Sequence, residues 1–167
     1  MIKRGRGKRG QLEISFGMIF SIIIIIATVI TAFYVIRYFL DLNKCSDASG
    51  FYDGLQGEVS KAWNSRLYSG SYEGKLPSNI QYVCFWNNTQ VITGRKFLTQ
   101  YNAVKEYTSV VEKKNVYLYP PTSACTGMVS YNLKYVKIDG FNCFPVNNSR
   151  VKIPLSMGSF DSLVKIG

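Results

Sequence analysis

The feature that most constrains this chain is an uncharged run of 23 residues, 14–36, directly behind a short basic leader. As a helix the run would be about 34 Å long, enough to cross the hydrocarbon layer of a bilayer. Five Lys or Arg residues precede it, at positions 3, 4, 6, 8 and 9. This bias favours a cytoplasmic N-terminus. The sequence therefore predicts a single-pass membrane protein whose C-terminal domain is extracellular.

The run is too long for a cleaved secretory signal, whose apolar region has about 7–15 residues before a small-x-small site. A lipoprotein site at Cys45 is equally poor, because Asn43 and Lys44 stand where small residues are required. Two interpretations remain open: a permanent anchor, and an anchor that is trimmed on its cytoplasmic side.

The second interpretation depends on Lys8-Arg9-Gly10-Gln11-Leu12-Glu13, a basic pair and a glycine followed by a polar residue and an acid. This segment resembles the class III signal peptide of archaeal type IV pilin-like proteins, and the resemblance covers about residues 8–36. It implies that a prepilin peptidase cuts between Gly10 and Gln11, leaving the apolar helix on the mature protein. It also implies that Glu13 pairs with a neighbour's terminal amine, although the best-known pattern has this acid fifth in the mature chain and here it would be third.

Small residues recur along one stripe of the apolar helix, at Gly17, Ser21, Thr28 and Ala32. Helices in lipid associate by close packing along such stripes. The stripe predicts an assembly surface through which the helix packs against copies of itself. The alternative is that these residues are simply common in membrane helices.

We divide the chain into a basic leader (1–10), a transmembrane or filament-core helix (11–40), a helical stem (41–70) and an α+β head (71–167). Residues 41–167 hold 14 Lys or Arg and 9 Asp or Glu, a net charge of about +5. Because this excess is modest, we expect no nucleic-acid partner.

The outer part predicts two helices and an antiparallel sheet, an α+β head of pilin-like design. Leu55, Val59, Ala62 and Trp63 fall on one face of the stem, and three glycines at 50, 54 and 57 predict a bend near its start. Ser69-Gly70-Ser71 should end the helical region. A second helix should bury Phe97, Leu98, Tyr101, Val104 and Tyr107. Strands are expected at 80–86, 115–119, 131–138, 142–146, 150–155 and 162–166.

All four cysteines, Cys45, Cys84, Cys125 and Cys143, lie on the predicted outer side, where an oxidising environment favours disulfides. Zinc is the weaker interpretation, because the chain has no histidine and no Cys-x-x-Cys pair. Three pairings are open. We favour Cys84 with Cys143, since both lie in strand-like runs, and therefore Cys45 with Cys125.

Two further patterns are less specific. Asn87 and Asn147 begin Asn-x-Ser/Thr triplets in polar turns and are eligible for glycosylation on an exterior domain. Two Ser-x-x-Lys matches, at 149–152 and 162–165, lie in strand-like runs, where the serine and lysine point to opposite faces. With no histidine and no phosphate loop, we expect no catalysis, no metal and no cofactor.

These observations support two hypotheses. The first is a pilin-like structural subunit of an extracellular filament or related surface assembly, with the membrane, a prepilin peptidase and copies of itself as partners. The second is a single-pass membrane-anchored extracellular binding domain that retains its leader.

Overall fold

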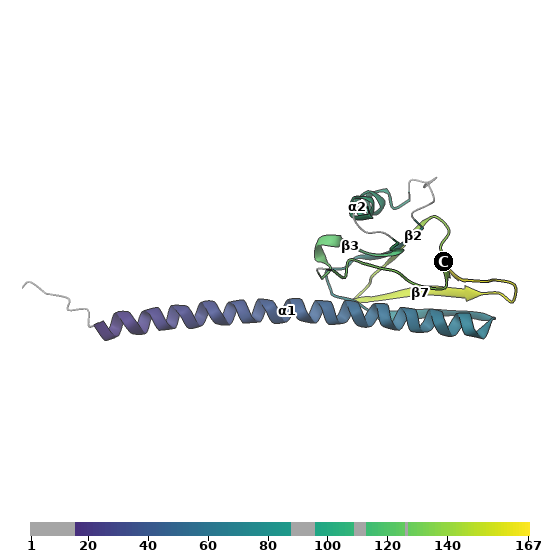
Figure 1. Cartoon of the computed structure of the whole chain (residues 1–167). Helices are drawn as coiled ribbons and strands as arrows, with labels where there is room; N and C mark the ends of the chain where they lie inside the picture. Colours follow the sequence, from purple (N-terminus) through teal and green to yellow (C-terminus); the bar gives the residue numbers. More distant parts are fainter. Residues whose placement is uncertain (1–15, 88–95, 109–112, 126) are drawn as a thin grey trace, which may run out of the picture. The chain divides into compact units, whose positions relative to one another are not determined.

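The computed structural model describes residues 16–87, 96–108, 113–125 and 127–167. The chain forms two compact units, Met1–Phe39 and Leu40–Gly167. One long helix, α1 (Phe16–Ser65), supplies the described part of the first unit and the stem of the second (Figure 1). The second unit is an α+β domain, which confirms the predicted fold class.

The stem of α1 is amphipathic. Its buried residues recur at helical spacing and form one side of the main core: Ala48, Phe51, Tyr52, Leu55, Val59 and Ala62. Trp63, predicted to share this face, is 37% exposed instead. The helix ends at Ser65, after which Arg66 adopts a left-handed conformation with φ of 56°.

The predicted bend at the three glycines is wrong, because α1 continues unbroken through Gly50, Gly54 and Gly57. Gly54 has a packing role. A Cβ there would overlap the hydroxyl oxygen of Tyr72 and lie 3.1 Å from its Cζ. The glycine lets a strand approach the helix closely, and burial of the neighbouring face compensates for its low helix propensity.

The strand that approaches α1 is β1 (Tyr68–Lys75), which the sequence analysis missed, since Ser69-Gly70-Ser71 was expected only to end the helical region. Three glycine or serine residues and a further glycine at 74 weaken its β signal. Gly74 is required by packing, because a Cβ there would lie 2.5 Å from the Phe51 ring.

The first of two sheets has the order β1-β7-β8-β5. β1 pairs antiparallel with β7 (Arg150–Met157), from Tyr68 opposite Met157 to Lys75 opposite Arg150. β8 (Val164–Ile166) pairs antiparallel with β7 and parallel with β5 (Val136–Lys137). The inward residues of β7 alternate along the strand and join the core formed with the stem of α1: Val151, Ile153, Leu155 and Met157.

The second sheet is fully antiparallel, in the order β4-β3-β2-β6. Its strands are β4 (Ser130–Tyr131), β3 (Val116–Tyr119), β2 (Tyr82–Trp86) and β6 (Phe141–Pro145). β2 is buried on both faces: Val83 and Phe85 join the core with α1, and Cys84 and Trp86 join a second cluster. That cluster also contains Val104 of α2 (Leu98–Thr108), so α2 covers the other face of this sheet.

Two expectations about the head need correction. The strand predicted at 131–138 is divided, with β4 in one sheet and β5 in the other; Tyr135, with φ of 66°, interrupts the extended backbone between them. The second helix buries Val104 fully, but Leu98 and Tyr107 are exposed. A short 3₁₀ helix, η1 (Pro121–Ser123), follows β3.

Candidate functional sites on the helix and the head

The N-terminal half of α1 is apolar and entirely exposed. Every described residue from Phe16 to Leu42 is exposed, and one 18-residue window has a mean hydropathy of 2.8. By length and composition this helix is able to cross a membrane. An apolar surface of this extent requires lipid or protein around it, because soluble monomers rarely expose large contiguous apolar patches.

All four residues of the predicted stripe lie on this half of α1. At about 100° per residue they fall within about 60° of the helix circumference. The Ser21 hydroxyl donates to the carbonyl oxygen of Gly17 at 2.8 Å, and the Thr28 hydroxyl to that of Ile25 at 2.8 Å. These hydroxyls are satisfied within their own helix, so the stripe offers shape rather than hydrogen-bond donors to a partner.

Beside Thr28 and Ala32 the helix surface is shallowly hollowed. Ala27, Thr31, Val35 and Ile36 complete the lining of this hollow. The Thr31 hydroxyl also donates to its own helix, to the carbonyl oxygen of Ala27 at 2.7 Å. Small side chains with no unsatisfied donor are the kind of surface that allows two helices to approach closely in lipid. The predicted processing residues Gly10 and Gln11, and Glu13, lie outside the described residues.

Two disulfides hold the head, in the pairs that the sequence analysis favours. Cys84 and Cys143 are directly opposite each other on β2 and β6, with Cα atoms 4.0 Å apart. Cys45 of α1 is bonded to Cys125, just after η1, with Cα atoms 5.1 Å apart. The first bond crosslinks two neighbouring strands, and the second fastens the stem to a loop of the head. Both candidate glycosylation residues, Asn87 and Asn147, are exposed.

The stem and β1 are joined by a polar contact at the surface. The Tyr68 hydroxyl donates to Glu58 Oε1 at 2.5 Å, and Lys61 Nζ lies 3.2 Å from the same oxygen. The hydrogen bond from Tyr68, followed by the contacts with Lys61, lowers the pKa of Glu58. Deeper in the head, the buried Tyr52 hydroxyl donates to the carbonyl oxygen of Met128 at 3.0 Å, and desolvation raises its pKa.

The lysines of both Ser-x-x-Lys matches are ion-paired. Lys152 Nζ lies 3.6 Å from Glu73 Oε1, and Lys165 Nζ lies 2.8 Å from Asp161 Oδ1. In both matches a carboxylate, rather than the serine of the motif, is the partner that lies closest to the amine. Among the residues that the structure describes, no three His, Cys, Asp or Glu side chains gather as metal ligands would.

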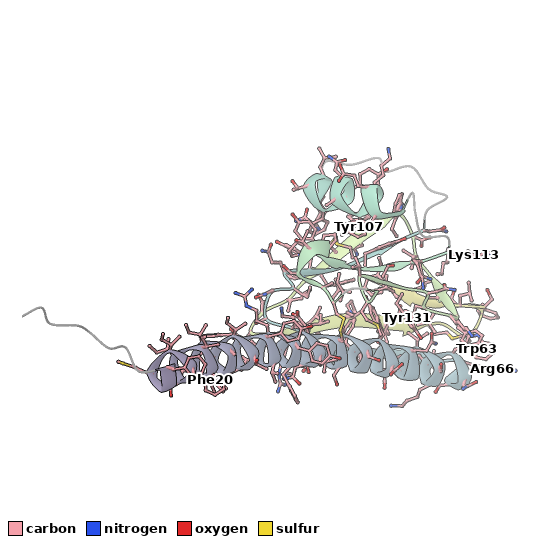
Figure 2. The ribbon with its side chains drawn as sticks, turned by 60° about the vertical axis from the view of Figure 1, so that its left-hand side comes forward. Phe20, Trp63, Arg66, Tyr107, Lys113 and Tyr131 are labelled. Carbon is pink, nitrogen blue, oxygen red and sulfur yellow. A yellow bond between two sulfur atoms is a disulfide. The ribbon has the colours of Figure 1, made fainter. Side chains whose placement is uncertain are left out.

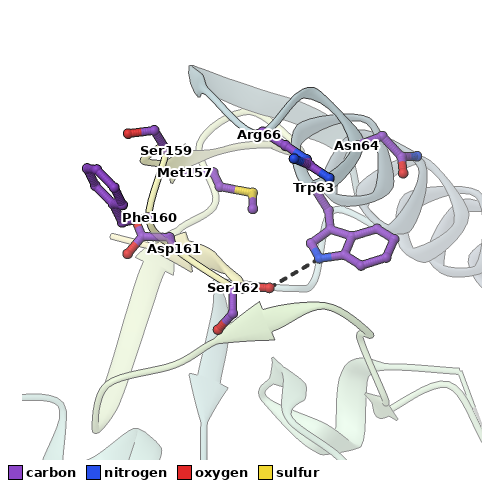
Figure 3. A pocket seen from close by; sticks show the side chains of 8 residues that line it. All are labelled: Trp63, Asn64, Arg66, Met157, Ser159, Phe160, Asp161 and Ser162. Atoms are coloured by element: carbon purple, nitrogen blue, oxygen red, sulfur yellow. Dashed lines mark hydrogen bonds between the residues drawn. The ribbon is translucent and has the colours of Figure 1, made fainter.

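A hollow of about 450 Å³ lies where α1 ends, and the sequence analysis did not predict it. Trp63, Asn64 and Arg66 line it from the end of α1, and the β7–β8 turn supplies the rest: Met157, Ser159, Phe160, Asp161 and Ser162 (Figure 3). The Trp63 indole N–H donates to the carbonyl oxygen of Ser162 at 3.2 Å, and its ring stacks on Tyr135 at 4.2 Å. The hydrogen bond joins two residues 99 positions apart in the sequence.

Comparisons of the chain with protein-family models, with curated proteins and with solved structures find no match.

Proposed function

We propose that this chain is a pilin-like structural subunit of an extracellular filament or a related surface assembly. The observation that carries the proposal is the difference between the two halves of α1. The C-terminal half contributes buried residues to the core of the head, and the N-terminal half is apolar and exposed. In this proposal the basic leader holds the N-terminus in the cytoplasm and the head lies outside. The apolar half then passes from lipid into a filament core made of its copies.

Two further observations support an exterior head and an assembling helix. Both disulfides lie in the second unit, Leu40–Gly167, and disulfides persist in oxidising surroundings. Along the stripe, the satisfied hydroxyls favour helix association by close packing. The resemblance of residues 8–13 to a class III signal peptide adds the trimming step, with Gly10 before the cut, Gln11 as the new N-terminus and Glu13 as the partner of a neighbour's amine.

The leader provides the first test. Intact mass of the protein from cells that contain a prepilin peptidase should show a mature chain beginning at Gln11. Gly10→Val should block trimming without preventing membrane insertion. Gly7→Val is the matched control, because it alters another leader glycine away from the cut, and it should be trimmed normally. A wild-type chain that keeps its leader would point to the second hypothesis, a permanently anchored binding domain.

The stripe provides the second test. Ser21→Ala and Thr28→Val keep the volume of the stripe and remove hydroxyls that are already bonded within the helix. Both variants should therefore assemble like the wild type. Ala32→Leu adds bulk to the stripe and should reduce filament yield in electron micrographs. Equal yields from all three variants would exclude this stripe as the assembly surface, whether or not the leader is trimmed.

A further inference from the structure

At the end of the head where α1 stops, an aromatic side chain projects beside a hollow. Phe160 lies at the tip of the β7–β8 turn and is fully exposed, and Leu67 next to the helix end is 73% exposed. We propose that this end of the head is a docking surface for a second copy of the chain. In the pair, Phe160 of each head enters the hollow of the other.

The turn that presents Phe160 is held in place on both sides of the ring. The backbone N–H of Gly158 donates to Asp161 Oδ2 at 2.9 Å, and the N–H of Asp161 donates to the carbonyl oxygen of Gly158 at 3.0 Å. Lys165 Nζ fixes the second carboxylate oxygen at 2.8 Å. Because these contacts brace the backbone of the turn, binding would have to order only the Phe160 side chain, which lowers the entropic cost of using it as an anchor.

The residue types around the hollow favour a protein partner. Its lining includes Trp63, Arg66, Met157 and Phe160, and none of its lining residues is lysine or glutamate. Tryptophan, phenylalanine, methionine and arginine are enriched at protein interfaces, and they make up half of the eight lining residues. Serine and aspartate are depleted at interfaces and supply three others, Ser159, Asp161 and Ser162, all on the β7–β8 turn. Tryptophan and arginine are also over-represented among the side chains that carry most of the binding energy.

The charges indicate that the partner is another copy. Among the described residues, Arg66 takes part in no ion pair. Asp161, on the same surface, is 26% exposed and its oxygens can each accept a further hydrogen bond. Lys165 already pairs with this carboxylate, so Arg66 of a second copy would join an existing ion pair through the remaining lone pairs of Asp161. A two-fold pair would place Arg66 of each head against Asp161 of the other.

The contact is small, so the pair should be weak in solution and strengthened where many copies share a membrane. The proposed contact lies beside Ser65, at the end of α1, whereas the stem begins at Leu40. The 26 helical residues from Leu40 to Ser65 span about 39 Å. A two-fold contact pairs heads and cannot extend a polar filament. The inference therefore does not depend on the proposed filament, and either can fail alone.

The full chain, with one copy in each lipid nanodisc, separates head contacts from association of the apolar helices. Sedimentation velocity should show paired discs with a dissociation constant on the order of 10–100 µM. Phe160→Ser should weaken pairing at least about tenfold, as expected for a central anchor, and its fold is safe because the ring is fully exposed. Arg66→Asn should weaken it too, since asparagine tolerates the left-handed backbone at that position.

Two control variants carry the same chemistry elsewhere on the head. Leu98→Ser removes an exposed apolar side chain from α2, and Arg150→Asn removes an exposed arginine at the opposite end of β7. Both should pair like the wild type. A benzophenone side chain in place of Phe160, irradiated in a mixture of ¹⁵N-labelled and unlabelled chains, should crosslink to Trp63 or Met157 of the other copy. Failure of the wild type to pair at roughly 200 µM, pairing by Phe160→Ser equal to wild type, or crosslinks elsewhere would each overturn the proposal.

Discussion

Replacing Gly54 with alanine should destabilise the head, whereas the same change at Gly50 or Gly57 should stabilise it. All three glycines lie inside α1, where alanine gains about 1 kcal/mol of helix propensity over glycine. A Cβ at Gly50 or Gly57 meets no atom within 4 Å, so this gain is realised in full. At Gly54 the new methyl group would overlap the end of the Tyr72 side chain.

Tyr72 cannot move aside freely, because its hydroxyl donates to the carbonyl oxygen of Phe51 at 3.1 Å and its ring packs against the Phe51 ring at 5.7 Å. Displacing it costs about 1–3 kcal/mol for overpacking and about 1 kcal/mol for the lost hydrogen bond. After the propensity gain is subtracted, Gly54→Ala should lower the free energy of unfolding by about 1–3 kcal/mol. The difference between Gly54→Ala and Gly50→Ala should then be about 2–4 kcal/mol.

Urea unfolding of the full chain in detergent micelles measures these values. Both tryptophans, Trp63 and Trp86, lie in the head's unit and report its unfolding by fluorescence. Tyr72→Phe removes the atom nearest to the new methyl group, so a double-mutant cycle with Gly54→Ala should recover about 1 kcal/mol. If all three glycine variants change stability by the same amount and sign, β1 does not pack on α1 as described here.

Two other predictions concern the contacts that fasten the stem. Cys45→Ser combined with Cys125→Ser should lower the free energy of unfolding by about 4 kcal/mol in the same assay, the loop-closure entropy of about 58 residues. The loop has this length because the remaining bond from Cys84 to Cys143 shortens the path, which runs through the 39 residues from Cys45 to Cys84 and the 18 residues from Cys125 to Cys143. A loss below about 1 kcal/mol would contradict this reasoning. Tyr68→Phe removes a hydrogen bond to the charged Glu58 and should lower the free energy of unfolding near pH 7. The loss should be only about 1 kcal/mol, because solvent partly screens this bond. Folding lowers the pKa of Glu58, so its contribution to stability is complete above the unfolded pKa of about 4.5 and is lost as the pH falls through the folded pKa. The stabilities of the wild type and Tyr68→Phe should therefore converge in acid. A stability difference that stays constant from pH 7 to pH 3 would exclude the charge on Glu58 as its origin.

Sequence periodicity predicted most of the elements, because each depends on a local pattern. The apolar run, the buried face of the stem and the alternation along β7 can all be read from neighbouring residues. The pairing of Cys84 with Cys143 also followed from a local signal, since each lies in a strand-like run and the strands are neighbours in the sheet.

The features that the sequence did not reveal depend on distant contacts. β1 is a strand because it pairs with β7, about eighty residues later, and its glycines fit against Phe51 and Tyr72 rather than ending a helix. The hollow beside Phe160 likewise requires the end of α1 and the β7–β8 turn to meet. In the sequence, Phe160 stands between a serine and an aspartate, and this local pattern does not predict the hollow. The residues that form the hollow with it are close only in the folded structure.

The two sulfur bridges interlock along the chain, since Cys84 lies between Cys45 and Cys125, and Cys125 lies between Cys84 and Cys143. A protease that hydrolyses any one peptide bond between Cys45 and Cys143 therefore releases no fragment, because at least one bridge still joins the two pieces. Nicked molecules would keep their mass under native and denaturing conditions alike and fall apart only with a thiol reductant. A single cleavage between Cys45 and Cys143 would therefore leave the domain covalently in one piece.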